Sequence, residues 1–223
     1  MLYDETAVRA NIRNRDGKRV FYLRSGDTLT PLARDFLRKE RIEILPAHEA
    51  KIQRYRLLSG GYAEEKPEQM THLNGDVLVL KTHPRIRFRG MVDLLEAELL
   101  LCGPETGEIL SLARRLIRCD VLDEPVGEFT LYGLTQEQQR QHSHFPQDYY
   151  GIPHFMPDFS DGEQVLRLNR CRSVCRQAEL AAVEAFSDKD GVLTRGDIVQ
   201  ALNRMSSMLY ILMIRRKRSD GKH

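Results

Sequence analysis

The chain has 223 residues, of which 34 are Lys or Arg and 32 are Asp or Glu, so its formal net charge is +2. This length suggests one full domain with at most a small second one, and a general nucleic-acid or membrane-surface binder would need a marked basic excess. The longest strongly apolar stretch, residues 205–214, is shorter than the ~20 residues that a membrane-spanning helix requires. Since the first residues carry no apolar signal-peptide segment, we expect a cytoplasmic globular protein.

The first 58 residues are predicted to form a small α+β module. A short helix is expected over residues 4–11, and strands are expected over 20–23 and 42–45. A second helix should begin after Thr30, because threonine is a good N-cap and Pro31 fits the first helical position. The module has no concentration of catalytic residue types, which favours an interaction or structural role.

A mainly helical region is predicted after the module. Residues 59–69 combine two glycines, a proline and several charges, a composition typical of a linker. Residues 70–218 then show apolar side chains three and four positions apart, which predicts a bundle of four to five helices, and 219–223 form a tail. The expected helices cover 86–101, 109–122, 163–186 and 196–216.

An aromatic segment interrupts the helical pattern. Residues 141–162, QHSHFPQDYYGIPHFMPDFSDG, contain three prolines, three histidines and five aromatic side chains. A loop of this length in a compact domain is usually functional or disordered, and its aromatic content argues against disorder. It is therefore the first place to look for a ligand.

Polar side chains lie beside the apolar stripes of three predicted helices. Asp93 needs a partner if it is buried, since an unpaired buried charge costs several kcal/mol, and the helix over 163–186 offers one. The polar side chains on the three helices either share one site or form ordinary solvated faces, and spacing alone favours the second interpretation. Besides Asp93, they are Arg172, Arg176 and Glu179 on the helix over 163–186, and Asn203, Ser206 and Tyr210 on the helix over 196–216.

The four cysteines are predicted to be free thiols. Cys171 and Cys175 lie one helical turn apart, a spacing that could hold a metal ion, but no further cysteine accompanies them. Small apolar core residues are the favoured interpretation.

Four segments of the chain together form a recognisable pattern. They are MTHLNGDVLVLKTHPRIRFRGMVDLLEA (70–97), SHFPQDYYGIPHFMPDFSDG (143–162), LNRCRSVCRQAE (168–179) and ALNRMSSMLYILMI (201–214). They resemble the ATP:cob(I)alamin adenosyltransferases of ethanolamine utilisation, the EutT group, and the resemblance is nearly end to end. A more distant resemblance links the chain to the PduO-type adenosyltransferases, helical bundles that place ATP and corrinoid between subunits of a trimer.

The resemblance implies a set of site residues. Lys81, Arg85, Gly90 and Asp93 match the K…R…G…D pattern of the PduO-type enzymes, and Asp93 is implied to pair with Arg172. The implied catalytic residues are Asp93, Arg172 and Arg176. The implied corrinoid-binding residues are His154, Phe155 and Met156, with the lower-face position open between the first two. The implied ATP-binding residues are Lys81, Arg85, Arg176, Glu179, Asn203 and Arg204.

The resemblance also implies the reaction and its partners. The enzyme would transfer the 5′-deoxyadenosyl group of ATP to cob(I)alamin with Mg²⁺, releasing triphosphate and supplying adenosylcobalamin to ethanolamine ammonia-lyase. A corrinoid reductase, a homo-oligomer (a trimer favoured) and association with a bacterial microcompartment are further expectations. Many EutT proteins carry a histidine followed by CCxxC, but residues 59–101 contain no cysteine, so no metal site is expected. The alternative is a non-enzymatic corrinoid carrier or microcompartment scaffold, which would not need the Asp93, Arg172, Arg176 and Asn203 set.

Overall fold

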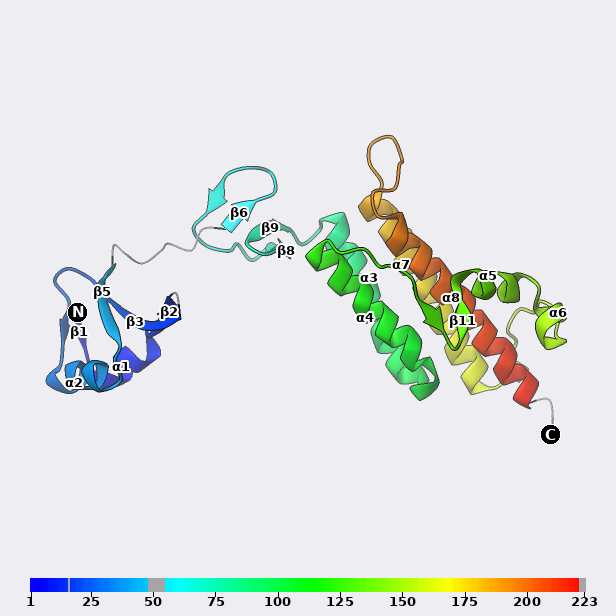
Figure 1. Cartoon of the computed structure of the whole chain (residues 1–223), viewed down its shortest axis with the longest axis horizontal. Helices are drawn as coiled ribbons and strands as arrows, with labels where there is room; N and C mark the ends of the chain where they lie inside the picture. Colours follow the sequence, from blue (N-terminus) through cyan, green and yellow to red (C-terminus); the bar gives the residue numbers. More distant parts are fainter. Residues whose placement is uncertain (16, 48–54, 221–223) are drawn as a thin grey trace. The chain divides into compact units, whose positions relative to one another are not determined.

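The computed structural model describes residues 1–15, 17–47 and 55–220, and the chain divides into two compact units, Met1–Arg54 and Tyr55–His223 (Figure 1). Residues 48–54 of the predicted module and 221–223 of the predicted tail lie outside the described residues. Each unit has its own hydrophobic core, so each is described by itself.

The first unit is a small mixed α+β fold. Its sheet has the order β2-β3-β5, with β3 parallel to β5, while β1 and β4 form a separate parallel pair. The Thr30 hydroxyl accepts the Ala33 backbone N–H at 3.2 Å, which confirms the predicted cap. The elements are β1 (Leu2–Tyr3), α1 (Glu5–Ala10), β2 (Arg13–Arg15), β3 (Lys18–Leu23), β4 (Thr28–Leu29), α2 (Pro31–Lys39) and β5 (Glu43–Pro46).

The second unit begins with a four-stranded sheet rather than a linker. Its strands are β6 (Tyr55–Leu57), β7 (Tyr62–Ala63), β8 (Met70–Asn74) and β9 (Val77–Leu80), in the order β7-β6-β9-β8. Gly60 and Gly61 have φ angles of 100° and 82°, which favour glycine, and they turn the chain from β6 back into β7. The structure therefore differs from the predicted boundary at residue 58 and linker over 59–69, because a hairpin turn has the same composition as a linker.

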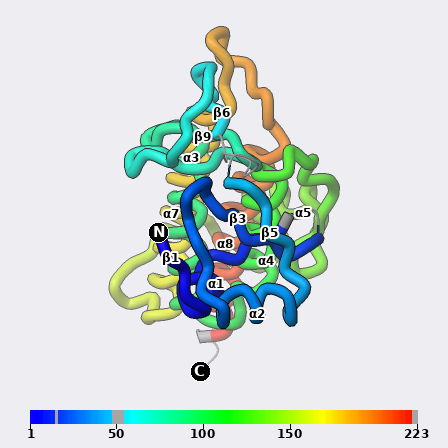
Figure 2. The backbone as a smooth tube through the Cα atoms, turned by 90° about the vertical axis from the view of Figure 1, so that its left-hand side faces the viewer, coloured from blue at the N-terminus to red at the C-terminus, as the bar shows by residue number. Residues whose placement is uncertain are grey.

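Four long helices form the bundle, as predicted. They are α3 (Pro84–Cys102), α4 (Gly107–Leu122), α7 (Glu163–Phe186) and α8 (Gly196–Asp220). α3 packs against α4 and α7, and α7 packs against α8 (Figure 1). Figures 1 and 2 both show the connection between α7 and α8, residues 187–195 in orange, projecting beyond the end of the bundle.

The predicted apolar stripes supply the core of the bundle. Leu95 and Leu99 of α3, Leu116 of α4, Leu168 of α7 and Met205 of α8 are fully buried. All four cysteines are buried free thiols. No helix within the described residues is both long enough and apolar enough to cross a membrane.

The segment over 141–162, predicted as one irregular loop, is partly helical. A short hairpin of β10 (Thr130–Leu131) and β11 (Leu134–Thr135) leads into α5 (Gln136–His144), which packs against α8 and is followed by α6 (Pro146–Tyr150). Pro146 starts α6 at its first position. Neither piece is long enough to show the 3.6-residue periodicity by which sequence reveals a helix. The irregular part is residues 151–158, followed by the short turn η3 (Phe159–Asp161).

Candidate active site between α7 and α8

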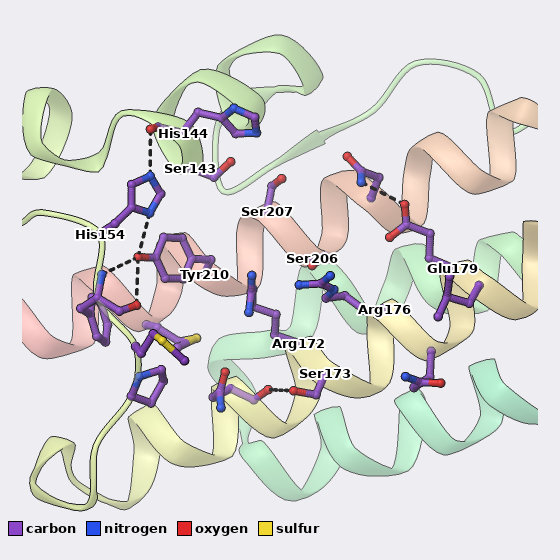
Figure 3. Close-up of a pocket in the computed structure, with 18 of the residues that line it drawn as sticks. Ser143, His144, His154, Arg172, Ser173, Arg176, Glu179, Ser206, Ser207 and Tyr210 are labelled. Atoms are coloured by element: carbon purple, nitrogen blue, oxygen red, sulfur yellow. Dashed lines mark hydrogen bonds between the residues drawn. The ribbon is translucent and has the colours of Figure 1, made fainter.

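A pocket of about 1120 Å³ lies between α7, α8 and the loop 151–158 (Figure 3). α8 lines it with the buried side chains of Ser206 and Tyr210, and the end of α5 contributes Ser143 and His144. Seven of the residues that the resemblance implied line it together: Arg172, Arg176 and Glu179 from α7, Asn203 from α8, and His154, Phe155 and Met156 from the loop.

Two arginines on α7 give the pocket a positive wall. Arg172 and Arg176 are one helical turn apart, and both side chains reach into the space between α7 and α8 (Figure 3). Burial lowers the pKa of Arg172, and the neighbouring charge of Arg176 lowers this pKa further. Neither guanidinium has a carboxylate partner among the described residues. Such a pair suits a polyanion such as a phosphate chain.

Glu179 and Asn203 join the two helices at one end of the pocket. The Asn203 amide donates to a Glu179 carboxylate oxygen at 2.9 Å. Glu179 is the single carboxylate among the described residues that line the pocket. No group of three or more His, Cys, Asp or Glu side chains in the described part of the chain is arranged to hold a metal ion.

Two consecutive residues of the loop 151–158 contact the hydroxyl of Tyr210 on α8. The Phe155 N–H donates to the Tyr210 hydroxyl at 3.0 Å, and His154 Nδ1 lies 3.2 Å from the same oxygen. His154 Nε2 lies 2.9 Å from the carbonyl oxygen of His144. Met156, the next residue, is 90 % exposed. The loop therefore presents the apolar side chains of Phe155 and Met156 to the pocket, while the polar groups of His154 and the Phe155 N–H are hydrogen-bonded within the protein.

Lys217, near the end of α8, supports the same loop. Its ammonium group pairs with the Asp161 carboxylate and lies 4.5 Å from the centroid of the Phe155 ring. The hydrogen bond from Lys217 is the main cause that holds the pKa of Asp161 below its usual value. Sequence reasoning missed this residue because basic side chains at a helix C-terminus are common without any functional role.

Asp93 does not pair with Arg172 within the chain. It lies on the exposed side of α3, and among residues 1–15, 17–47 and 55–220 it has no hydrogen bond or ion pair. α3 turns Val92 and Leu95 into the core, and Asp93 is rotated by about 100° around the helix axis from Val92 and further from Leu95. The sequence places a carboxylate beside the apolar stripe, but the packing of α3 on α7 leaves it in solvent.

Arg85 is engaged away from the pocket. Its Nε donates to Asp120 at 2.9 Å and its second nitrogen donates to the Asp120 carbonyl at 2.7 Å. Arg89 Nε donates to the other Asp120 carboxylate oxygen at 2.6 Å, and the Asp120 side chain is fully buried. Sequence reasoning missed Asp120, because it lies inside an otherwise ordinary helical stripe.

Lys81 and Arg204 also lie outside the pocket lining. Lys81 is exposed in the turn between β9 and α3. Arg204 is half-buried on α8, where burial and the charge of Arg140 lower its pKa. Arg176, Glu179 and Asn203 of the implied ATP set are therefore brought together, and Lys81, Arg85 and Arg204 are not.

Comparison with known proteins gives concordant matches. The sequence model of the family described as cobalamin adenosyltransferase matches residues 61–216. Corrinoid adenosyltransferase EutT of Salmonella typhimurium (strain LT2) is 30 % identical over 241 residues, which cover 94 % of this chain and 90 % of that protein. Corrinoid adenosyltransferase EutT of Escherichia coli (strain K12) is 35 % identical over 158 residues, which cover 67 % of this chain and 59 % of that protein. With both the family match and the near full-length relative, this chain belongs to the cobalamin adenosyltransferase family.

Proposed function

We propose that the chain transfers the 5′-deoxyadenosyl group of ATP to the cobalt of cob(I)alamin, forming adenosylcobalamin and releasing triphosphate. The observation that carries this proposal is the pocket itself. Two arginines without a carboxylate partner in the described chain, Arg172 and Arg176, line the same cavity as the apolar loop residues Phe155 and Met156. A corrinoid carrier would use the loop but has no need for a polyanion-binding wall.

The nucleotide half of the pocket, which is lined by Arg172, Arg176, Glu179 and Asn203, stabilises the leaving group. Cob(I)alamin is itself a strong nucleophile, so the protein needs no general base, whereas the departing triphosphate carries several negative charges. Arg172 and Arg176 can donate charge-assisted hydrogen bonds where that charge develops. Glu179 fits a Mg²⁺ ion, which prefers oxygen ligands and is commonly held by one or two carboxylates with substrate phosphates, and the ion would neutralise part of the charge.

The corrinoid half of the pocket, which is lined by His154, Phe155 and Met156, keeps water away from the cobalt. Both ring nitrogens of His154 are engaged, by Tyr210 and by the His144 carbonyl, so a bond from this ring to cobalt would break one of them. We therefore assign the lower-face wall to Phe155 and Met156. An apolar wall that excludes an axial ligand makes cob(II)alamin easier to reduce, a tuning of the substrate by its surroundings.

We further propose that the chain belongs to the EutT branch that works without a metal cluster. The absence of cysteine from residues 59–101 supports this assignment. Cys175 is fully buried, and burial raises the pKa of its thiol, which disfavours the thiolate that a metal would require.

The resemblance to the ethanolamine-utilisation group makes ethanolamine ammonia-lyase the proposed recipient of the product, and a separate reductase the proposed source of cob(I)alamin. We also propose that the protein associates with a bacterial microcompartment.

The activity is tested with ATP and chemically reduced cobalamin. The protein is first treated with a chelator of transition metals, and Mg²⁺ is then restored. We expect the spectral change of Co–C bond formation together with release of triphosphate. Absence of both products at any protein concentration would favour the carrier, and recovery only with zinc or iron would contradict the metal-free assignment.

We propose that a second copy of the chain completes the site in a homo-oligomer, with a trimer favoured. Lys81 and Asp93 are exposed and lie outside the pocket of their own chain, so a neighbouring copy could bring them to it. Asp93→Ala and Arg172→Ala should each lose activity, and mixed oligomers of the two should regain part of it, because some sites then hold both native side chains. Mixed oligomers, proved by two different tags, that stay inactive would contradict this arrangement.

A further inference from the structure

Tyr210 occupies the boundary between the two halves of the pocket. It lies on α8 with only 7 % of its surface exposed, and its hydroxyl points to the loop (Figure 3). The hydroxyl oxygen lies 3.0 Å from the Phe155 nitrogen, 3.2 Å from His154 Nδ1 and 3.4 Å from the Phe155 carbonyl oxygen. A tyrosine hydroxyl has one proton to donate and can accept two hydrogen bonds.

The protons of this cluster can be assigned from the partners. The His144 carbonyl can only accept, so His154 Nε2, at 2.9 Å, carries the proton of the neutral ring. Nδ1 is then an acceptor. The Tyr210 hydroxyl accepts the Phe155 N–H and has one proton for two acceptors, His154 Nδ1 at 3.2 Å and the Phe155 carbonyl oxygen at 3.4 Å. One oxygen thus fixes both the His154 ring and the Phe155 backbone.

The ring of Tyr210 contacts the other half of the pocket. The Arg172 guanidinium carbon lies 5.3 Å from the ring centroid, within the range of a cation–π interaction. Arg172 has no carboxylate partner among the described residues, so the tyrosine ring is the group that supports its charge. Tyr210 therefore contacts the corrinoid half of the pocket through its hydroxyl and the nucleotide half through its ring.

We infer that Tyr210 is a positioning residue that couples the binding of the two substrates, an inference that rests on the proposed function for their identity. The hydroxyl already joins the loop to α8, so a nucleotide that holds Arg172 against the Tyr210 ring restricts the remaining motion of that ring and, through the hydroxyl, of the loop before the corrinoid binds. The second ligand then loses less conformational freedom on binding. Coupling between binding sites is reciprocal and is commonly about 5- to 150-fold in affinity.

Tyr210→Phe tests the inference, because it removes the hydroxyl and keeps the ring under Arg172. The dissociation constant of ATP is measured by calorimetry without and with saturating cob(II)alamin, and the ratio of the two is the coupling factor. We expect a factor of about 5 or more for the native chain. In Tyr210→Phe the factor should fall toward one while ATP affinity in the absence of corrinoid is unchanged.

Tyr150→Phe is the matched control. The Tyr150 hydroxyl lies 2.9 Å from His142 Nδ1, and the guanidinium of Arg215 lies 5.8 Å from its ring centroid, yet Tyr150 does not line the pocket. This variant should keep the native coupling factor. Arg172→Met is a second test, because it removes the cation from the Tyr210 ring and keeps the hydroxyl. It should also lower the coupling factor, so the inference can be tested even if Tyr210→Phe fails to fold.

The outcomes separate this inference from the proposed function. A native chain that binds both substrates with a coupling factor of one overturns the inference and leaves the function standing. Equal factors in the native chain, Tyr210→Phe and Arg172→Met also overturn it. A native chain that binds neither substrate overturns the function itself.

Discussion

Replacing Asp120 by alanine is expected to lower the free energy of unfolding by about 3–5 kcal/mol, because two guanidinium groups lose their shared buried carboxylate. Arg85 and Arg89 each contact a different oxygen of Asp120, and their side chains are only 22 % and 15 % exposed. Removing one partner of such a cluster leaves positive charges without compensation in a poorly solvated place. Urea-induced unfolding followed by circular dichroism measures the loss.

Glu184→Ala is the control for this prediction. Glu184 of α7 accepts from Arg87 of α3 at 3.1 Å, but both side chains are largely exposed. An exposed ion pair typically contributes about 0–1 kcal/mol, since water and salt screen it. Similar losses for Asp120→Ala and Glu184→Ala would show that the Asp120 cluster does not stabilise the bundle as proposed.

Arg176→Ala is expected to lower the rate of adenosyl transfer by about 10²- to 10³-fold whether or not the cobalt has been reduced beforehand. The reason is that the triphosphate loses a donor aimed at its developing charge, and removal of one such donor has effects of this size. Arg176 is a suitable target because it has no other hydrogen bond or ion pair among the described residues, so few structural contacts are lost with it. The assay starts from cob(II)alamin with a reductase system and, separately, from cob(I)alamin made with a strong chemical reductant.

Phe155→Ala is the matched variant in the corrinoid half. It should be slow when cob(II)alamin must be reduced on the enzyme, because its lower face is then open to water or to its own base. Chemical reduction beforehand should restore most of the rate, since alkyl transfer itself does not need the wall. ATP affinity should change little. Equal rescue of Phe155→Ala and Arg176→Ala would mean that the two halves of the pocket do not have the proposed roles.

Local sequence patterns determined most of the secondary structure. The predicted helix over 163–186 has the same bounds as α7, and Thr30 caps its helix as expected. These features depend on neighbours one or two turns away, which sequence spacing records directly. The hairpin at residues 55–63 and the short helices within 136–150 were harder to recognise, because turn residues also occur in linkers and a two-turn helix shows little periodicity.

The sequence, through the family resemblance, also named seven residues that line one pocket in the structure. Helical spacing placed four of them beside the apolar stripes of α7 and α8, whereas only the resemblance pointed to the three on the loop 151–158. Only the tertiary structure decided which charges meet. It pairs Arg85 with Asp120 and leaves Asp93 in solvent, and it brings Tyr210 and Lys217 to Phe155. Spacing fixes the face of a helix on which a side chain lies, whereas a pair between helices depends on their relative rotation and translation, which the packing of all core side chains sets together.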